Sequence, residues 1–248
     1  PIIRSRRHKA TATRAVVRTR SISLSSHAPV ALFVFNRPEH TLRTLQALSL
    51  NALAEKTPLH IFSDAPRNES DAISVREVRD AIQAIKGFAS ITVVERESNM
   101  GLASSIINGV TRLCEEYGRV IVLEDDLVTS PGFLSYMNDA LEHYRHQPEV
   151  GSISAYMYPV DSSTAEAGTV MLEHPMSWGW ATWSDRWKNF KKIKKKTFYF
   201  DIKKNFKKKF DYLNSGSYLG LLLNFKRKAN TWAVYWYYTI FKNKGLTI

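Results

Sequence analysis

Two patterns of apolar positions alternate along the first 150 residues of the chain. A continuous apolar run of strand length is followed four times by apolar residues at helical spacing. The four runs are PVALFVFNRP at 29–38, PLHIFSDAP at 58–66, SITVVERES at 90–98 and RVIVLEDD at 119–126. Continuous apolar strands are typical of parallel sheets. The repeated strand–helix order predicts an α/β fold with a mostly parallel, Rossmann-like sheet flanked by helices. A fifth strand is expected at VGSISAYMY, residues 150–158.

Polar residues gather where these four strands end. Asn36 and Arg37 follow the first strand, Asp64 the second, Asn99 the third, and three carboxylates at 124–126 the fourth. Ligands of parallel α/β sheets bind at the carboxyl ends of the strands, so these side chains are expected to converge on one crevice. The fingerprints GxGxxG and GxxxxGK[ST] are absent from the sequence, which argues against ordinary dinucleotide and P-loop sites.

The acidic triplet Glu124, Asp125 and Asp126 needs an electrostatic partner. Like charges about 4 Å apart repel by roughly 4 kcal/mol at an effective dielectric constant near 20. Mg²⁺ and Mn²⁺ prefer oxygen ligands, commonly one or two carboxylates with substrate phosphates, and would suit this cluster. If the strand stays extended, Glu124 and Asp126 point to one side and Asp125 to the other. The alternative is a solvated turn with Ser130 as the next helix cap. Glu124 and Asp126 pointing away from any cavity, or paired with the protein's own arginines, would contradict the enzyme hypothesis that rests on the metal ion.

LEDDL after an apolar strand resembles the metal-binding motif of GT-A glycosyltransferases, particularly the Golgi N-acetylglucosaminyltransferase I group and a bacterial family 2-like set of sugar transferases. Further stretches are similar to that set in the same order: FVFNRPEHTLRTLQAL, IFSDAPRNE, NMGLASSIINGV, SWGWATWSDRW and NTWAVYWYYTIFKNKGLTI. The likeness spans residues 29–248. It implies a GT-A-like fold, a nucleotide-diphosphate sugar as donor, Mn²⁺ or Mg²⁺ as cofactor, and a Trp-rich acceptor region.

The resemblance also implies roles for individual residues. Asp126 would coordinate the metal, and Glu124 and Asp125 would contact the ribose or the donor sugar. Three residues match positions that hold the nucleotide, although each also suits a turn without a ligand: Asn36, Arg37 and Asp64. A wall for the acceptor or the donor sugar would be formed by Trp178, Gly179 and Trp180, with core packing as the alternative for the aromatic residues.

A general base is the part of the pattern that the sequence lacks. An inverting transferase needs a base, usually Asp or Glu, near the acceptor hydroxyl. Related enzymes place an aspartate in the Trp-rich C-terminal segment, whereas KANTWAVYWYY contains no acid. The acids after residue 170 are Glu173, Asp185, Asp201 and Asp211, and the sequence leaves the base unassigned. Asp185 in WSDRW lies nearest the aromatic residues, and an ion pair with Arg186 or a lysine is the alternative. His174 is the histidine expected nearest the pocket.

Charge is unevenly placed along the 248 residues, which carry a formal net charge of +12. Residues 1–27 contain seven Arg and Lys and no acid, so a disordered basic tail is expected there. A second basic block, Lys188–Lys209, is a candidate contact for nucleic acid, an anionic membrane face or a phosphorylated acceptor, and the alternative is a solvated face of a partly helical insert. Residues 28–150 would form a nucleotide-sugar-binding half, and residues 151–248 an acceptor-side half that we interpret as truncated.

Composition narrows the expected setting. The single cysteine, Cys114, lies among apolar residues at helical spacing and excludes an internal disulfide, which fits a reducing compartment. No apolar run approaches the roughly 18 residues of a membrane span. We therefore expect a cytoplasmic protein, with the inner face of the membrane as a site of peripheral contact.

The leading hypothesis is a metal-dependent, inverting glycosyltransferase that acts on a glycan or lipid-linked acceptor. A nucleotidyltransferase is the second hypothesis, because acidic strand ends also bind nucleoside triphosphates; the missing glycine-rich basic loop counts against it. The third is a basic module that binds nucleic acid or membrane without catalysis. Its basic residues would spread over the acidic crevice, whereas they cluster in residues 1–27 and 188–209, so nucleic acid is not the expected partner.

Overall fold

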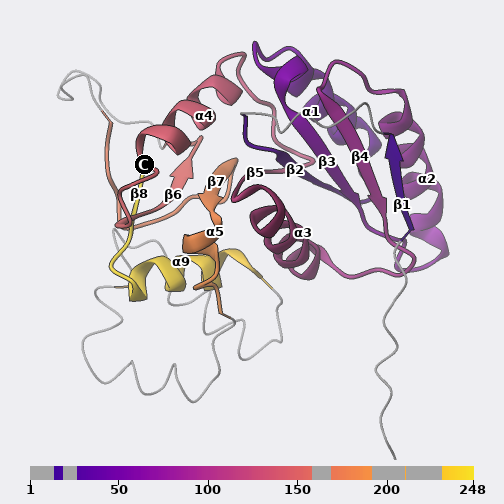
Figure 1. Cartoon of the computed structure of the whole chain (residues 1–248). Coiled ribbons are helices and arrows are strands. Elements are labelled where there is room, and N and C mark those ends of the chain that lie inside the picture. The colour runs from indigo at the N-terminus through magenta and orange to yellow at the C-terminus, as the bar shows by residue number, and fades with distance from the viewer. Residues whose placement is uncertain (1–13, 19–26, 158–168, 192–209, 211–230) are drawn as a thin grey trace, which may run out of the picture.

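The computed structural model describes residues 14–18, 27–157, 169–191, 210 and 231–248. One mixed sheet, in the order β1-β4-β3-β2-β5-β7-β6-β8, runs through it (Figure 1). The strands are β1 Arg14–Arg18, β2 Val30–Val34, β3 Pro58–Ser63, β4 Ser90–Glu95, β5 Arg119–Glu124, β6 Val150–Ser154, β7 Trp180–Trp183 and β8 Leu246–Thr247. β2 pairs in parallel with β3 and β5, and β3 pairs in parallel with β4. The expected α/β class, a mostly parallel sheet flanked by helices, is confirmed.

Four helices connect or follow the parallel strands: α1 Pro38–Ser49, α2 Glu69–Ala84, α3 Leu102–Tyr117 and α4 Phe133–His143, with a short 3₁₀ turn, η1, at Ala54–Lys56. Local sequence explains their ends. Pro38 pre-sets the first turn of α1, and the Asn68 side chain caps α2 by accepting from the backbone N–H of Asp71. Gly118 ends α3 in the left-handed conformation that glycine favours, at φ 76°.

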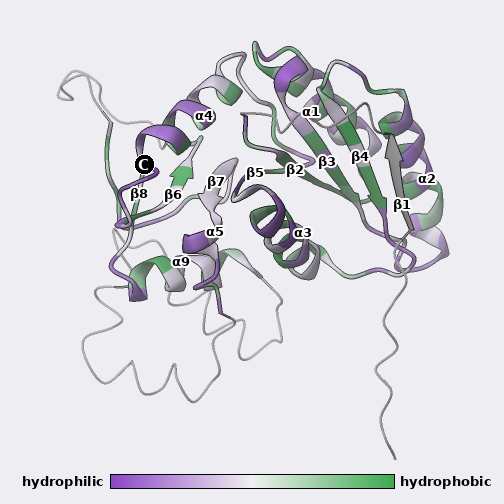
Figure 2. Ribbon diagram, in the orientation of Figure 1, coloured by the Kyte–Doolittle hydropathy of each residue, from purple (hydrophilic) through white to green (hydrophobic). Residues whose placement is uncertain are grey.

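The apolar pattern of the strands is explained by a core on each face of the sheet. β2 and β3 are buried along their whole length. Alternate residues of β5 separate the two cores, because Ile121 and Leu123 join one cluster and Val120 and Val122 the other. α1 and α4 cover the first cluster, and α3 covers the second. Figure 2 shows the central strands mostly in the hydrophobic colour and hydrophilic stretches along the helices.

The C-terminal half extends the same sheet. β7 pairs antiparallel with β5 and with β6, and the short helix α5, Ser184–Trp187, follows it. Helix α9, Ala233–Lys242, brings further aromatic rings to the cluster under β7. Trp180 there lies 5.1 Å from Trp232 and 5.8 Å from both Trp187 and Trp236, between ring centroids. The expected Trp-rich C-terminal region is present as a packed aromatic cluster.

Some expectations differ from the structure. The four strand–helix units and the fifth strand are found where predicted, but α4 begins after Gly132 without a side-chain cap, so Ser130 is not its N-cap. Arg14–Arg18 forms β1, antiparallel to β4, where a disordered tail was expected, and the other residues before His27 lie outside the described residues. The basic block is described only at its start, because residues 192–209 lie outside as well. No helix in the described ranges has the length and apolar character that crossing a membrane requires.

Candidate active site

The carboxyl ends of the parallel strands surround a cavity of about 400 Å³. Loops after β2, β3 and β4, the turn after β5 and the first turns of α3 all contribute to its lining. The expected convergence is therefore found for five polar residues: Asn36, Arg37, Asp64, Asn99 and Asp125. Phe33 and Phe62, stacked with ring centroids 5.0 Å apart, form an apolar side of the same cavity. Its volume lies within the usual range for small-molecule sites.

Arg37 supplies positive charge to two of the three clustered carboxylates. One guanidinium nitrogen lies 3.0 Å from Oδ2 of Asp126, and the other donates to Oδ1 of Asp125. Asp125 is buried, whereas the Asp126 side chain is 43% exposed. Burial raises the pKa of Asp125, and Arg37 opposes that rise. The condition set against the enzyme hypothesis is therefore met for Asp126, which pairs with an arginine, but not for Glu124, which forms no ion pair among the described residues. Repulsion between Asp125 and Asp126 alone no longer calls for a metal ion.

Glu124 lies apart from this ion-pair network. The extended backbone ends at Glu124 and a turn follows, so the condition under which Glu124 and Asp126 were expected to share one side is not met. Strand alternation directs Glu124 to the face of Val120 and Val122, the face of the aromatic cluster. Burial first, and then the charges of Asp126 and Asp125, raise the pKa of Glu124 to about 7. Arg37 and a hydrogen bond from the Trp232 side chain counteract part of that rise.

Asp64 organises the loop that leads into α3. Its two carboxylate oxygens accept from the backbone N–H groups of Ala65, Met100 and Gly101, each at 2.9 Å. Gly101 has φ 72°, a left-handed backbone conformation that favours glycine. Because Asp64 is 6% exposed and already accepts three hydrogen bonds, its direct effect is to hold the cavity wall in place.

Asn36 belongs to a second network, which the sequence did not reveal. Its amide donates to Asp71 Oδ1 at 2.7 Å, and Arg67 Nε donates to Asp71 Oδ2 at 2.7 Å. These bonds, with that from Arg67 the strongest, hold the pKa of Asp71 at about 2. Arg67 also lies 5.1 Å over the ring of Phe35 and lines the cavity. The acid in the first turn of α2 was the available signal, but its partner 35 positions earlier is a tertiary contact.

A second cavity, of about 250 Å³, lies beside the aromatic cluster and has no charged side chain in its described lining. Trp178 lines it, is 49% exposed, and packs edge-on against Tyr156. Trp232, the hydrogen-bond donor to Glu124, lines it too, as does His174, whose pKa is lowered by burial. Trp178 and Gly179 precede β7 and so lie at the edge of the sheet where β5 ends.

Two expected site residues are misplaced for their roles. Trp180 is 1% exposed within the aromatic cluster, so the packing alternative holds and the wall is restricted to its neighbours. Asp185 lies beyond the amino end of β5, because antiparallel pairing sets Trp183 opposite Arg119. At roughly 3.3 Å per residue, β5 separates it by on the order of 17 Å from Glu124. Asp185 pairs with Arg186 at 2.6 Å, so the ion-pair alternative is confirmed, and its position argues against Asp185 as the base.

The carboxylates of the cavity could hold a metal ion only if a bound ligand supplied further oxygen atoms. Among the described residues, no group of three or more His, Cys, Asp or Glu could hold a metal ion. Mg²⁺ and Mn²⁺ are, however, often held by one or two carboxylates completed by substrate phosphates and water. Asp126 is exposed and shares only one oxygen with Arg37, which itself lines the cavity, and this suits a ligand of that kind.

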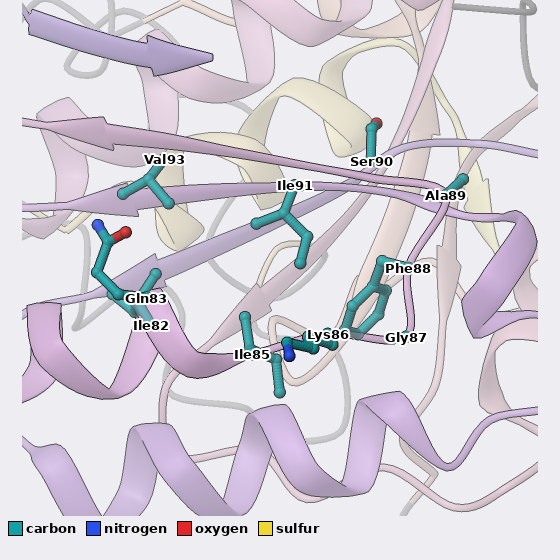
Figure 3. A pocket seen from close by; sticks show the side chains of 10 residues that line it. All are labelled: Ile82, Gln83, Ile85, Lys86, Gly87, Phe88, Ala89, Ser90, Ile91 and Val93. Carbon is teal, nitrogen blue, oxygen red and sulfur yellow. The ribbon is translucent and has the colours of Figure 1, made fainter. Parts of the chain in front are cut away.

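A third hollow, of about 330 Å³, lies at the opposite edge of the sheet (Figure 3). It is bounded by the end of α2 and the start of β4, with Ile85, Phe88 and Ile91 turned toward it. Lys86 is the one charged side chain in its described lining. The clustered charged and polar side chains lie at the carboxyl ends of the strands, so this hollow is not the candidate site.

Comparisons with known proteins were made on sequence and structure. No family model matches the chain, and no curated protein does. Among solved structures, the mannosyltransferase PcManGT from Pyrobaculum calidifontis, in complex with GDP-Man and Mn²⁺, matches with 16% identity and a TM-score of 0.43 over 63% of this chain and 44% of its own. TarS 1–349 from S. aureus matches with 10% identity and a TM-score of 0.42 over 63% and 47%.

A nucleotide-diphospho-sugar transferase, so described, from Desulfovibrio desulfuricans G20 matches with 11% identity and a TM-score of 0.42 over 69% of this chain and 70% of its own. The chain spans less than half of the length of the first two structures. At TM-scores below 0.5 these likenesses carry no argument about activity, which has to be inferred from the crevice itself.

Proposed function

We propose that the chain is a glycosyltransferase that uses a nucleotide-diphosphate sugar. The observation that carries this proposal is the convergence of Asn36, Arg37, Asp64, Asn99 and Asp125 on one cavity at the carboxyl ends of the parallel strands. That cavity has apolar sides for a nucleobase and polar groups for a ribose. Arg37 and Asp125 lie in its lining, and Asp126 pairs with the same arginine. Because two carboxylates face one guanidinium, a diphosphate would bind there together with a divalent ion.

Arg37 is placed to bind the diphosphate. Its side chain is 43% exposed, and the two aspartates hold its guanidinium in one orientation. The remaining N–H donors are therefore fixed in place before a ligand binds. Asp126 would hold Mn²⁺ or Mg²⁺ together with the phosphates. When bound, such an ion stabilises the charge that develops on the leaving diphosphate. Asp64 and the Asn36–Asp71 contact keep the surrounding loops in position.

The sugar end of the donor would point toward Glu124 and the second cavity. Glu124 joins the two regions, because it adjoins Asp125 and accepts from Trp232, which lines that cavity. The uncharged lining and the exposed ring of Trp178 suit the apolar face of a sugar, from the donor or from a glycan or glycolipid acceptor. His174 is the one imidazole or carboxylate in its described lining and is therefore our candidate base for an inverting reaction.

Titration calorimetry tests the proposal. We expect the chain to bind at least one of UDP, GDP, CDP and ADP more tightly in the presence of Mn²⁺ than in a chelator. Asp126→Ala should remove this Mn²⁺ dependence, whereas Asp139→Ala, an exposed aspartate on α4, should retain it. Unchanged Mn²⁺ dependence in Asp126→Ala would rule out the metal assignment. Failure of the unaltered chain to bind any of the four nucleotides, with or without Mn²⁺, would overturn the proposed function.

A further inference from the structure

Ser105 is the polar side chain of the main cavity that has no hydrogen-bond partner among the described residues. It is 4% exposed, lines the 400 Å³ cavity, and its hydroxyl has no hydrogen-bond partner among the described residues. The other polar side chains in that lining each have one: Asn36, Arg37, Asp64, Arg67, Asn99 and Asp125. A buried hydroxyl without a partner is unfavourable, so its retention at this wall points to a partner that arrives with a ligand.

Its position assigns it to the end of the cavity away from the charges. Ser105 lies one helical turn after Gly101, whose carbonyl accepts from the Ser105 N–H at 3.0 Å. Gly101 in turn is bound through its own N–H to Asp64, at the end of β3. Arg37 and the two aspartates, by contrast, follow β2 and β5. A nucleotide whose diphosphate lies at Arg37 therefore extends its other end toward Asp64 and Ser105.

The surroundings of Ser105 suit a base more than a sugar. Phe33, Phe62 and Leu102 contribute apolar surface to the same cavity, and a flat heterocycle with polar edges matches an apolar wall with one isolated hydroxyl. A ribose would bring several hydroxyls to a wall that offers few free partners. We propose that Ser105 determines nucleobase specificity, by hydrogen bonding to the edge of the bound base. This inference rests on the proposed function and names a residue for its donor preference.

Two matched variants test it. Ser105→Ala removes the isolated hydroxyl, and Ser104→Ala makes the same change at the adjacent position of α3, outside this cavity. Affinities for UDP, GDP, CDP and ADP are measured for the unaltered chain and for both variants, together with their melting temperatures. For the preferred nucleotide, we expect Ser105→Ala to lower the affinity roughly 5- to 10-fold and to reduce the preference over the other three. Ser104→Ala should leave both unchanged.

Stability gives a second, independent measurement. Deleting an unsatisfied hydroxyl and replacing it with the best helix former should raise the melting temperature of nucleotide-free Ser105→Ala by about 2–4 °C. A residue with a merely structural role would instead lose stability together with affinity. The combination of weaker binding and higher stability in one variant is therefore the expected signature.

The remaining outcomes overturn the inference in distinguishable ways. Unchanged affinity in Ser105→Ala, with the unaltered chain binding nucleotide, removes Ser105 as a determinant and leaves the proposed function standing. An equal loss for all four nucleotides would assign the hydroxyl to the ribose or phosphates, which contradicts a role in base selection. An equal loss in the two serine variants would indicate a general effect on α3. If the unaltered chain binds none of the nucleotides, the proposed function and the inference both fail.

Discussion

Glu124→Gln should change how the stability of the protein depends on pH. The folded state raises the pKa of Glu124 from its ordinary value of 4.5 to about 7, with burial as the largest cause. Between these two values the folded chain holds a proton that the unfolded chain has released. The free energy of unfolding therefore falls as pH rises through this window, by about 3 kcal/mol at about 1.4 kcal/mol per pH unit. Glutamine keeps the shape and cannot ionise, so it escapes this loss.

Because His60 also titrates in this pH range, the quantity to measure is the difference in unfolding free energy between Glu124→Gln and the unaltered chain. His60 is buried with both ring nitrogens unpartnered among the described residues, and burial lowers its pKa from 6.5 to about 4. Its contribution runs the other way, because the unfolded chain binds the proton first and stability falls as pH decreases from 6.5 to 4. The two residues thus oppose each other in the unaltered chain. His60 is present in both chains and cancels from the difference.

Urea unfolding, followed by tryptophan fluorescence at several pH values between 4.5 and 8 in the presence of a chelator, checks this prediction. The variant and the unaltered chain should be nearly equal in stability at pH 4.5. At pH 8 the variant should be more stable by roughly 2–4 kcal/mol. A difference that does not change with pH would refute the reasoning, because Glu124 would then be as solvated in the folded chain as in the unfolded one.

Three further variants probe the site and its support. Arg37→Met should lower the free energy of unfolding at pH 7 by about 1–3 kcal/mol, because it leaves buried Asp125 without its cation; an unchanged urea midpoint would contradict this. Gly109→Ala would place a methyl group 2.7 Å from Phe33 Cζ, and we expect a net loss of about 1–2 kcal/mol in spite of alanine's helix preference, measured by the same unfolding assay. Trp180→Ala should lower the free energy of unfolding by about 3–5 kcal/mol, because the side chain is buried. Trp178→Ala should lower sugar transfer and reduce the free energy of unfolding by less than about 1 kcal/mol. Equal shifts in melting temperature for the two variants would argue against their different placements.

The parts of the fold that could be predicted from the sequence are those set by local patterns. Continuous apolar runs and helical spacing identified the four strand–helix units, because burial on one face or two leaves a direct trace in the sequence. The polar residues that follow each strand also located the cavity, since parallel strands bring their carboxyl ends to one edge of the sheet. Asn36, Arg37, Asp64 and Asn99 reach that edge for this reason.

The parts that could not be predicted depend on distant contacts. The direction of β7 is a property of the whole sheet, and it decides that Trp178 lies at the crevice edge and Asp185 at the opposite one. The turn after Glu124 likewise ends the extended backbone before Asp125 and Asp126, which the apolar run itself does not reveal. Arg37 as the partner of Asp125 and Asp126 is a contact across about 90 positions, with no signal in the local sequence.

The pairing of β5 with β7 has a consequence for dividing the chain. Positions 119–122 of β5 form the seam to β7, and Val120, Ile121 and Val122 are at most 1% exposed there. A fragment that stopped at residue 150 would present this seam as a bare, apolar edge, which invites self-association. If the two halves were produced together, β5 of one could pair with β7 of the other, as in the intact chain. We therefore expect the halves to reassemble when they are expressed together and to associate with themselves when they are expressed alone.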